Sequence, residues 1–497
     1  MTIKHIVKKI IRADPDSRRV DASNAMQKIR GNPQELQLTG FLQMYNESES
    51  GNLSRCLAHL DGICDDIVIY DDGSTDDSVS IAREFTRNII ASDSNDFGRE
   101  IFHKQQLLDL AVSLKPGWIV WLDADEVFDR EGELGGIRAL CQYGLEHNID
   151  GFSLLEYNLW KSEKHYRVDE LWLKNWQVRL WRNNGKLRYD LKEGLHNKMY
   201  PAGMESIYRS NIKVIHYGFS SEEKVNSKHA LYMSHGQTGK WLERIKDETG
   251  LVLNKCSVDW FPLSMLKITV VCLIYRSIGY ANFVLESFRT HTRGAGKNVE
   301  FLFVANDPTD ELLNYLQGNK IQHLSFRNKD PNEYYINRVY RAWNYGGSSA
   351  PGDIIIFVNS DMAFSDGWLE NLLRNLREDR IVTSRLVESG RLRSGKYGIE
   401  RDFGRTYTQF DDAAFQGFAK KISANVIKEG GLFMPCAIYK DLFIKSGGYP
   451  IGNRTESDGR IKSGDFIFFY ENLESAGITH YTVFDSIVYH IQKGEMG

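Results

Sequence analysis

The chain of 497 residues is poor in cysteine and lacks the cysteine patterns of metal-bound or disulfide-stapled proteins. Its six cysteines are scattered, and no two of them form a Cys-x-x-Cys pair. The sequence therefore predicts neither a zinc knot nor a disulfide framework. A reducing compartment, the cytoplasm, is the expected location.

Long apolar runs and an excess of positive charge are also missing. We find no apolar stretch of about 18 residues that could span a bilayer, and no signal peptide. The formal net charge of −4 disfavours a nucleic-acid partner, because such proteins usually carry a basic excess that neutralises phosphates. We expect a protein that is made and kept inside the cell and that binds small nucleotides at most.

Two common nucleotide-binding signatures are absent as well. No Gly-x-Gly-x-x-Gly follows the first expected strand of either half, and no Gly-Lys-Ser/Thr phosphate loop occurs. These absences disfavour a dinucleotide oxidoreductase, although such an enzyme would share the α/β rhythm described below.

The composition that remains is that of a globular protein. Hydrophobic residues make up 42% and charged residues 26%, which argues against disorder. Since single domains rarely exceed about 250 to 300 residues, a chain of this length is expected to form two domains.

Residues 1–36 form an N-terminal segment with a basic amphipathic pattern at 3–12. Isoleucine and valine side chains fall on one helical face and basic side chains on the other. The pattern fits a helix docked on the domain or on another subunit, and it also fits peripheral contact with the inner face of a membrane.

From Leu38 onward, apolar strand-like runs alternate with amphipathic stretches, as expected for β-α-β units around a mostly parallel sheet. The same rhythm restarts at Leu266, after a polar helical stretch and a short connection. We therefore predict a first domain at 37–260 and a second domain at 265–497.

Three blocks of sequence recur in the same order in the two halves. Residues 41–45 match 271–275 at an offset of 230, residues 69–76 match 303–310 at 234, and residues 118–125 match 354–361 at 236. An almost constant offset of this length indicates the duplication of a whole domain rather than a solenoid repeat.

Acidic residues follow two expected strands of the first half. The buried-strand run 67–70 ends in Asp71 and Asp72, and the run 118–122 ends in Asp123 and, two residues on, Asp125. Open α/β sheets bind ligands at the carboxyl ends of their strands. Alternate residues of an extended chain point the same way, so Asp123 and Asp125 could hold Mg²⁺ or Mn²⁺ together with substrate phosphates. The alternatives are an Asx turn that caps a helix and a solvated acidic turn.

These residues resemble the family 2 glycosyltransferases, whose domains have the A-type glycosyltransferase fold. The resemblance covers about residues 38–235 and rests on Tyr45-Asn46-Glu47, the Asp-Asp-Gly-Ser-Thr-Asp block at 71–76, Asp-Ala-Asp-Glu at 123–126, Phe97-Gly98-Arg99 and Arg179-Leu180-Trp181-Arg182. It implies two tandem Rossmann-like α/β domains, a nucleotide-sugar donor, a divalent metal on the Asp-x-Asp pair, and inversion at the anomeric carbon.

The resemblance also assigns roles to residues of the first domain. Nucleotide-sugar binding falls to Tyr45, Asn46, Glu47, Asp71, Asp72 and Asp123. The metal falls to Asp125, with His216 as a further ligand or a structural histidine. Where relatives often show His-Glu, this chain has Glu193-Gly194-Leu195-His196-Asn197. We take Glu193 as the candidate general base, with Asp169 behind it; either could be a surface acid.

In the second domain the metal motif is reduced to Asn359-Ser360-Asp361, and the base motif is better preserved. The residues assigned to the nucleotide-sugar are Tyr275, Asn306, Asp310 and Asn359, and those assigned to the metal are Asp361 and His490. Asp465, in Gly464-Asp465-Phe466, is the candidate base; at a helix start it could instead be an N-cap.

The expected function is that of a metal-dependent, inverting glycosyltransferase of the hexosyltransferase type with two active centres. UDP-, GDP- or dTDP-sugars are the expected donors, Mn²⁺ or Mg²⁺ the cofactor, and a glycan or lipid-linked glycan the acceptor, in surface polysaccharide or lipid-linked oligosaccharide assembly. One alternative is a catalytic domain with a non-catalytic glycan- or nucleotide-binding twin. The others are a nucleotidyltransferase and a pure scaffold. Fold resemblance does not fix the sugar.

Overall fold

The computed structural model describes residues 19–20, 34–169, 172, 175–191, 200–234, 238–292, 297–328, 333–492 and 494–496. The chain divides into two compact units, Met1–Pro262 and Leu263–Gly497. The amphipathic segment 3–12 and the candidate base Glu193 lie outside the described residues.

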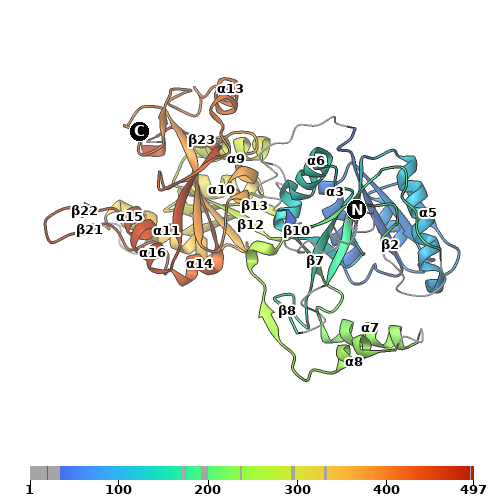
Figure 1. The fold of residues 1–497 in the computed structure, drawn as a ribbon. Coiled ribbons are helices and arrows are strands. Elements are labelled where there is room, and N and C mark those ends of the chain that lie inside the picture. Colours follow the sequence, from blue (N-terminus) through green and yellow to red (C-terminus); the bar gives the residue numbers. More distant parts are fainter. Residues whose placement is uncertain are drawn as a thin grey trace, which may run out of the picture. The chain divides into compact units, whose positions relative to one another are not determined.

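The first unit is built on a mixed sheet with mostly parallel strands (Figure 1). Its strands are β1 (Arg19–Val20), β2 (Leu38–Met44), β3 (Asp66–Asp71), β4 (Ile89–Ala91), β5 (Trp118–Trp121), β6 (Glu126–Phe128), β7 (Gly151–Asn158), β9 (Trp176–Arg182) and β10 (Ile207–His216). They lie in the order β1-β10-β7-β9-β5-β2-β3-β4, with β6 paired to β10. Strand β9 is antiparallel to both β5 and β7.

The helices of this unit cover both faces of the sheet. They are α3 (Asn52–Ile63), α4 (Ser78–Arg83), α5 (Glu100–Ser113) and α6 (Ile137–His147), with shorter helical turns at η3 (Phe97–Arg99), η4 (Gly132–Gly136) and η6 (Val258–Trp260). Successive side chains of β2 enter different cores: Phe41 packs with Leu107 and Leu108 of α5, and Leu42 packs with Leu57 of α3. The period of two thus buries the strand on both faces, as the continuous apolar runs predict.

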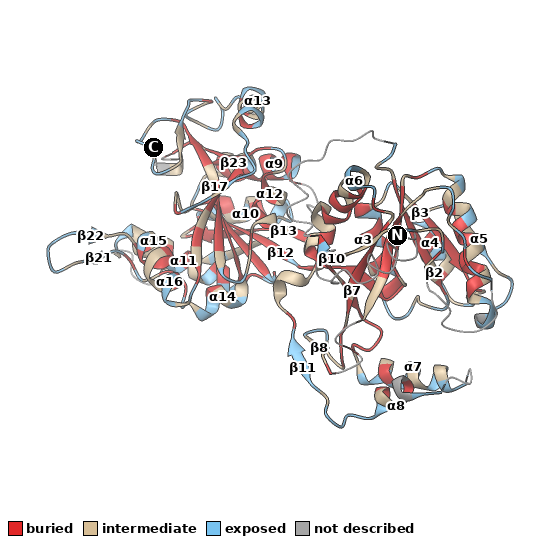
Figure 2. Cartoon of the chain, viewed as in Figure 1, coloured by how far each residue is buried: buried red, intermediate tan, exposed pale blue. Residues whose placement is uncertain are grey.

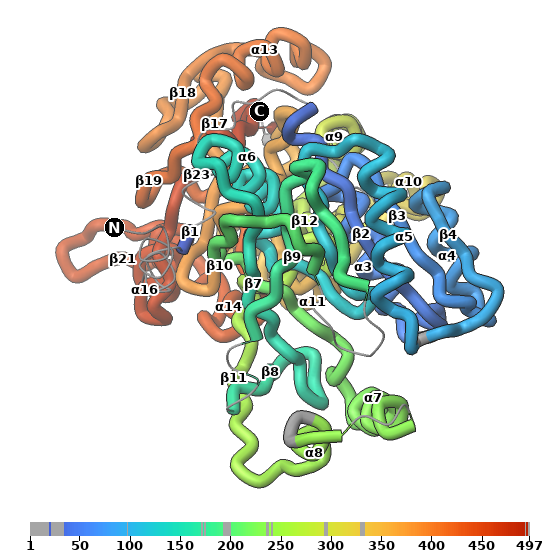
Figure 3. Tube along the Cα trace, turned by 45° about the vertical axis from the view of Figure 1, so that its right-hand side comes forward, coloured from blue at the N-terminus to red at the C-terminus, as the bar shows by residue number. Residues whose placement is uncertain are grey.

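A smaller hydrophobic cluster packs under the two helices that follow β10. Helices α7 (Glu222–Ser234) and α8 (Lys240–Lys246) lie side by side (Figure 3). A two-stranded sheet joins β8 (His165–Arg167) to β11 (Leu253–Lys255). The core under the helices contains Trp160, Trp172, Phe219, Val225, Leu242 and Ile245. This packing fixes α7 beside the carboxyl edge of the main sheet, where its side chains meet the strand ends.

The second unit repeats this architecture. Its strands are β12 (Ile268–Ile274), β13 (Val299–Asn306), β14 (His323–Phe326), β15 (Ile354–Asn359), β16 (Met362–Phe364), β17 (Arg380–Glu388), β18 (Ile399–Glu400), β19 (Ile427–Glu429), β20 (Cys436–Tyr439), β21 (Arg454–Thr455), β22 (Ile461–Lys462) and β23 (Thr479–His490). The main sheet runs β14-β13-β12-β15-β20-β17-β23-β16, and its central strands are buried (Figure 2).

The helices of the second unit also lie on both sides of its sheet. They are α9 (Ile278–His291), α10 (Asp310–Gly318), α11 (Tyr335–Ser349), α12 (Trp368–Arg374), α13 (Asp412–Ile422), α14 (Lys440–Lys445), α15 (Gly464–Ile467) and α16 (Leu473–Ser475), with turns at η7 (Leu263–Met265), η8 (Phe468–Asn472) and η9 (Gly494–Met496). Among the described residues of both units, no helix is long and apolar enough to cross a membrane.

Strand register confirms the predicted duplication. Phe41 of β2 lies opposite Val68 of β3 and Trp121 of β5. Their counterparts at the predicted offsets of 230, 234 and 236 pair in the same way, since Val271 of β12 lies opposite Leu302 of β13 and Phe357 of β15. In each unit one antiparallel strand, β9 or β20, interrupts the parallel ones. The predicted fold class, two tandem α/β units with mostly parallel sheets, is confirmed.

Candidate active site

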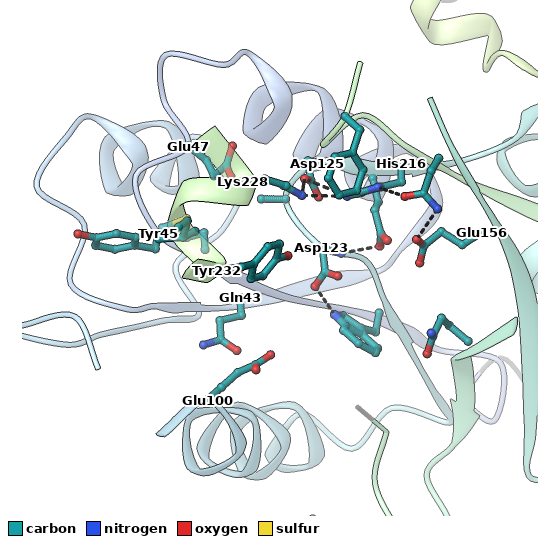
Figure 4. Close-up of a pocket in the computed structure, with 18 of the residues that line it drawn as sticks. Gln43, Tyr45, Glu47, Glu100, Asp123, Asp125, Glu156, His216, Lys228 and Tyr232 are labelled. Atoms are coloured by element: carbon teal, nitrogen blue, oxygen red, sulfur yellow. Dashed lines mark hydrogen bonds and ion pairs between the residues drawn. The ribbon is translucent and has the colours of Figure 1, made fainter. Parts of the chain in front are cut away.

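A cavity of about 800 Å³ opens at the carboxyl ends of β2 and β5 in the first domain (Figure 4). Among the described residues that line it, seven side chains are acidic, two are lysine or arginine, and one, His216, is a histidine. The acids are Glu47, Asp72, Glu100, Asp123, Asp125, Glu126 and Glu156, against Arg179 and Lys228. An excess of acids in a concave site raises the local concentration of cations. An anionic ligand could enter only with cations that offset this charge.

The two acids that end β3 have different surroundings. Asp72 lines the cavity, and its carboxylate accepts hydrogen bonds from Asn95 Nδ2 at 3.0 Å and from the N–H of Asp96 at 3.1 Å. Burial raises the pKa of Asp72. Asp71 is turned into its own loop, where it accepts from the N–H of Ser74 at 3.1 Å, and it is not among the cavity-lining residues. Its observed contact is that of the Asx turn considered as the alternative.

The residues after β2 also divide into two groups. Tyr45 and Glu47 line the cavity. Burial, and next the charge of Asp125, raises the pKa of Glu47. Asn46 binds the loop after β3, with its Oδ1 accepting from the N–H of Thr75 at 2.8 Å, and is not among the cavity-lining residues.

Asp123 is held by a buried cluster around Arg179 of β9. The guanidinium Nη2 lies 2.5 Å from Glu126 Oε1 and 3.1 Å from Glu156 Oε2, and Nη1 lies 3.5 Å from Asp123 Oδ2. Trp121 Nε1 donates to Asp123 Oδ1 at 3.1 Å and its ring lies under the guanidinium. Burial raises the pKa of Glu126 well above its usual range, and Arg179 opposes that shift. One cation therefore orients three acidic side chains at the cavity floor.

A chain of hydrogen bonds leads from this cluster to His216 at the end of β10. Asn158 Nδ2 donates to Glu156 Oε1 at 3.1 Å, and Asn158 Oδ1 lies 2.6 Å from His216 Nδ1. The other ring nitrogen, Nε2, lies 3.2 Å from Asp125 Oδ2. The predicted pair of Asp125 and His216 is thus brought together from positions far apart in the sequence.

Lys228 of α7 contacts both members of this pair. Its ammonium Nζ lies 2.6 Å from Asp125 Oδ2 and 3.0 Å from His216 Nε2 (Figure 4). Burial would raise the pKa of Asp125, but the charges of Lys228 and His216 hold it well below its usual range. The carboxylate is therefore ionised and already faces a cation.

Gly218 leaves the space that Lys228 needs. A Cβ atom at this position would lie 2.1 Å from Lys228 Nζ and 2.5 Å from Asp125 Oδ2 and from His216 Nε2. Such distances are far below van der Waals contact, so any side chain at 218 displaces the three groups.

Asp169, the second candidate for the general base, is paired with an arginine. Asp169 receives two hydrogen bonds from Arg167, at 2.6 and 2.9 Å, and both side chains are buried. Asp169 is not among the residues that line the cavity. Glu193 therefore remains the candidate base, as a prediction that lies outside the described residues.

The second domain places Asp361 and His490 in the same relation. Asp361 Oδ2 lies 3.4 Å from His490 Nε2, while His490 Nδ1 lies 3.0 Å from Glu388 Oε1. Burial lowers the pKa of His490, but the two carboxylates raise it to about 10. Both ring nitrogens thus face acceptors and carry protons, so a metal ion would have to replace one of these protons.

The other second-domain candidates are spread more widely. The N–H of Tyr275 donates to Glu495 at 3.1 Å, and Asn306 Oδ1 accepts from Asn328 Nδ2 at 3.1 Å. Asp310 lies in the first turn of α10 with its side chain 93% exposed, and Asn359 is the last residue of β15. Their roles in nucleotide-sugar binding stay predictions.

Asp465 lies in the first turn of α15, as the sequence indicates. The N-cap of that helix is Ser463, whose hydroxyl accepts from the N–H of Phe466. Asp465 Oδ2 instead accepts from Tyr340 Oη at 3.0 Å. Burial raises the pKa of this carboxyl group. Its role as a base stays a prediction.

The first-domain residues fit a divalent cation. Asp125 Oδ2 and His216 Nε2 converge on one point, at which the Lys228 ammonium already lies. Oxygen and imidazole nitrogen suit Mn²⁺ or Mg²⁺. In the described part of the chain, no group of three or more His, Cys, Asp or Glu side chains could hold a metal alone. Oxygens of a bound diphosphate would have to complete the coordination.

Comparison with known proteins identifies the family. The model of glycosyl transferase family 2 matches residues 41–212 and 269–425, which together exceed half of the chain. The chain belongs to glycosyl transferase family 2. The match falls on both units, so the tandem arrangement predicted from the repeated blocks is confirmed.

Two curated relatives are similar to part of the chain. The SPbeta prophage-derived glycosyltransferase SunS of Bacillus subtilis strain 168 and the glycosyltransferase SunS of Bacillus phage SPbeta are each 25% identical to it over 197 residues. This alignment covers 38% of this chain and 42% of each relative. The chain therefore spans less than half the length of these relatives.

Solved structures give a distant likeness. GalNAc-T7 in complex with UDP, GalNAc and Mn²⁺ has a TM-score of 0.33 and 15% identity, covering 48% of this chain and 46% of its own. S. aureus TarS 1–349 has a TM-score of 0.31 and 15% identity, covering 45% and 60%.

The sequence assigns no role to several residues of the site. Arg179 enters only as part of the motif Arg179-Leu180-Trp181-Arg182. Glu156 and Asn158 are polar residues in the otherwise largely apolar strand β7, and that interruption was the available signal. Lys228 lies on a polar helix that contains a second lysine, Lys224, so nothing in the local sequence distinguishes it.

Proposed function

We propose that the first domain transfers a sugar from a nucleotide diphosphate donor to a glycan acceptor, with a divalent cation between the protein and the diphosphate. The observation that supports this is the cavity at the strand ends with its large excess of acids. A diphosphate would be repelled from such a site unless a cation lay between them. Family membership selects glycosyl transfer over nucleotidyl transfer.

We assign different residues of the cavity to different parts of the bound donor and its cation. Asp72 and Asp123 present carboxylate oxygens to the cavity and are fixed by hydrogen bonds and by Arg179, so we assign them to the nucleoside. Asp125 and His216 hold the cation position. A bound Mn²⁺ or Mg²⁺ would offset the charge that develops on the departing nucleoside diphosphate.

We propose an inverting displacement, in which an acceptor hydroxyl attacks the anomeric carbon and a carboxylate takes its proton. Glu193 is the proposed base. UDP-, GDP- and dTDP-sugars are the candidate donors, and a surface polysaccharide or a lipid-linked oligosaccharide is the candidate product. Action in the cytoplasm, with peripheral membrane contact through residues 3–12, belongs to the same proposal.

For the second domain, the described contacts favour the twin without catalysis over a second active centre. Its one acid at the metal position, Asp361, is paired with a histidine that is itself shared with Glu388. A site with fewer available carboxylates binds a hard cation less well.

The test is a thermal-shift screen of the full chain against UDP-, GDP- and dTDP-sugars, with and without Mn²⁺. A donor at about 100 times its Kd should stabilise the domain by about 2.7 kcal/mol. We expect a Mn²⁺-dependent shift that Asp125→Asn abolishes and Asp361→Asn, its counterpart in the second domain, preserves. No shift with any donor, or a shift that persists in Asp125→Asn, would refute the proposed site.

A further inference from the structure

The position of Lys228 bears on how the cation enters. Three groups fix the His216 ring: Nδ1 lies 2.6 Å from the acceptor Asn158 Oδ1, and Nε2 lies 3.0 Å from the Lys228 ammonium and 3.2 Å from the Asp125 carboxylate. The ring is therefore held with Nε2 toward the position where Lys228 and Asp125 meet, which is the orientation that a metal ligand at this position requires.

The same point receives a carboxylate oxygen. Asp125 Oδ2 lies 2.6 Å from Nζ, and the Asp125 side chain is 8% exposed. An ionised, nearly buried carboxylate is costly unless it is paired with a cation. Without a metal ion, Lys228 supplies that cation from within the chain.

We propose that Lys228 is a built-in counter-ion that shares one position with the divalent cation. The cation reaches Asp125 and His216 only by displacing the ammonium, and the diphosphate that arrives with it compensates for the lost contact. Lys228 therefore weakens metal binding in the absence of donor and couples metal binding to donor binding. This inference rests on the proposed function of the first domain.

Titration of the full chain with Mn²⁺ alone, followed by electron paramagnetic resonance of the free ion, tests this coupling. Lys228→Met should bind Mn²⁺ at least about tenfold more tightly than the wild type, and Lys228→Arg should not. Lys224→Met is the matched control, because Lys224 lies on the same helix but contacts Asn52 and Ser220 at 3.3 Å instead. Its Mn²⁺ affinity should equal that of the wild type.

The outcomes separate the two proposals. Equal or weaker Mn²⁺ binding by Lys228→Met, in a chain whose melting temperature shows that it is folded, overturns the role of Lys228 and leaves the donor site standing. No Mn²⁺ binding by any variant, even with UDP, GDP or dTDP present, overturns the metal-dependent site and the role of Lys228 together.

A different observation concerns the second domain. After β23 the chain turns into η9, and the carboxylate of Glu495 enters the edge of the sheet. It accepts the N–H groups of Tyr275, Arg276 and Ser277 at 3.1, 2.6 and 2.8 Å, and the hydroxyl of Ser360 at 2.9 Å. These groups lie at the ends of β12 and β15, where an open α/β sheet binds its ligand.

The neighbouring residue covers the acid at the metal position. The N–H of Gly494 donates to Asp361 Oδ2 at 3.1 Å. A Cβ atom at 494 would lie 2.5 Å from the Cβ of Asp361, so the glycine is in direct contact with this side chain. Gly494 and Glu495 together take up both the Asp361 carboxylate and the main-chain donors after β12.

The first domain satisfies the main-chain donors of this region in another way. The N–H groups of Asn46 and Glu47, which correspond to Arg276 and Ser277, and of the next residue, Ser48, bind side chains of the segment 74–78 after β3, at 2.9, 2.8 and 3.0 Å. Those acceptors are Ser74, Ser78 and Asp76. The first-domain cleft therefore needs no carboxylate from a distant segment.

We infer that Gly494 and Glu495 close the nucleotide cleft of the second domain, with the Glu495 carboxylate in the place of an anionic ligand. While Gly494 and Glu495 keep these contacts, the second domain binds no nucleotide. Release of these two residues exposes three main-chain donors, the Ser360 hydroxyl and Asp361.

Calorimetric titration of the full chain with UDP, GDP and dTDP in the presence of Mn²⁺ tests the closure. For at least one nucleotide, Glu495→Ala should raise the number of bound molecules per chain by one. Gly494→Ala, whose methyl group cannot fit against Asp361, should do the same. Glu474→Ala, an acidic residue of α16, is the control and should change nothing. If the number of bound nucleotides per chain is unchanged in both Glu495→Ala and Gly494→Ala, the inference is overturned, whether or not the first domain binds nucleotide.

Discussion

The two domains have the same strand pairing at the ends of their central strands, but four side chains at these positions are charged in the first domain and uncharged in the second. Strand register and the repeat offset give four charged residues around the first cavity a counterpart in the second domain. Asp123, Glu126, Glu156 and Arg179 correspond to Asn359, Met362, Leu386 and Cys436. The fold is thus independent of the buried charges, since the second domain keeps the sheet after losing all four.

The pair that both domains retain is the aspartate after the central strand and the histidine at the end of the long strand. In the first domain Lys228 contacts this pair; in the second, Glu388 and the N–H of Gly494 do. The aspartate and histidine therefore do not define a cation site by themselves. The groups that follow the last strand decide whether it faces a ligand or the chain itself.

The largest expected effect comes from breaking the charge cluster one residue at a time. Arg179→Cys, the residue found in the second domain, leaves three acidic side chains without their cation and should destabilise the first domain by about 3 to 5 kcal/mol. Exchanging all four residues, Asp123→Asn, Glu126→Met, Glu156→Leu and Arg179→Cys, should restore stability to that of the wild type or above. Denaturant unfolding of the full chain measures both variants. A quadruple variant no more stable than Arg179→Cys would contradict the comparison.

The next effect is on catalysis. Asp125→Asn should lower the rate of donor hydrolysis or sugar transfer by about 100- to 1,000-fold, about 3 to 4 kcal/mol, because it removes a charge at the cation position. Asp361→Asn should leave the rate within about twofold of the wild type. Initial rates of nucleoside diphosphate release at saturating donor give the answer. Equal losses in both variants would mean that the second domain is also catalytic.

A pH dependence should distinguish the two histidines. The pKa of His490 is raised to about 10, so its stabilising contribution is fully present below pH 6.5 and is lost as the pH rises through 10. The second domain should lose about 3 kcal/mol of unfolding free energy between pH 7 and 10. His490→Asn should flatten this slope, whereas His216→Asn should leave it unchanged. Urea unfolding at several pH values is the measurement, and an unaltered slope in His490→Asn would refute the assignment.

The smallest effect concerns helices α4 and α10, which follow β3 of the first domain and its counterpart β13 of the second. The Thr309 hydroxyl caps α10 by accepting from the N–H of Leu312, whereas Asp77 makes no side-chain cap on α4. Thr309→Ala should cost about 1 kcal/mol, and Asp77→Ala should cost almost nothing. Thermal unfolding of the two variants should show that only the first lowers a transition.

The repeat was readable from the sequence because register ties the three blocks together. Residues at constant offset, such as Trp121 and Phe357, must occupy the same place on neighbouring parallel strands if the domain is duplicated. The acids at the strand ends were readable for the same reason. Asp72, Asp123 and Asp125 do line one cavity, as their positions after buried runs predict.

The rest of the site depends on contacts across the sheet. Arg179 reaches Glu126 and Glu156 from separate strands, and no short motif encodes that meeting. Asp71 shows the opposite difficulty, because a carboxylate after a strand can bind its own turn as well as a ligand. The sequence motif contains both acids, and the backbone conformation decides which of them faces the cavity.

The distance along the chain between Asp125 and Lys228 has a consequence for biosynthesis. The two residues are 103 positions apart, and ribosomes add about 5 to 20 residues per second. For some 5 to 20 seconds after Asp125 has been made, the nascent chain holds an aspartate whose counter-ion does not yet exist. The pocket of the first domain is therefore completed only after its strands have been made, and a chain truncated before α7 would contain all the strands of the main sheet but not the cation that faces Asp125.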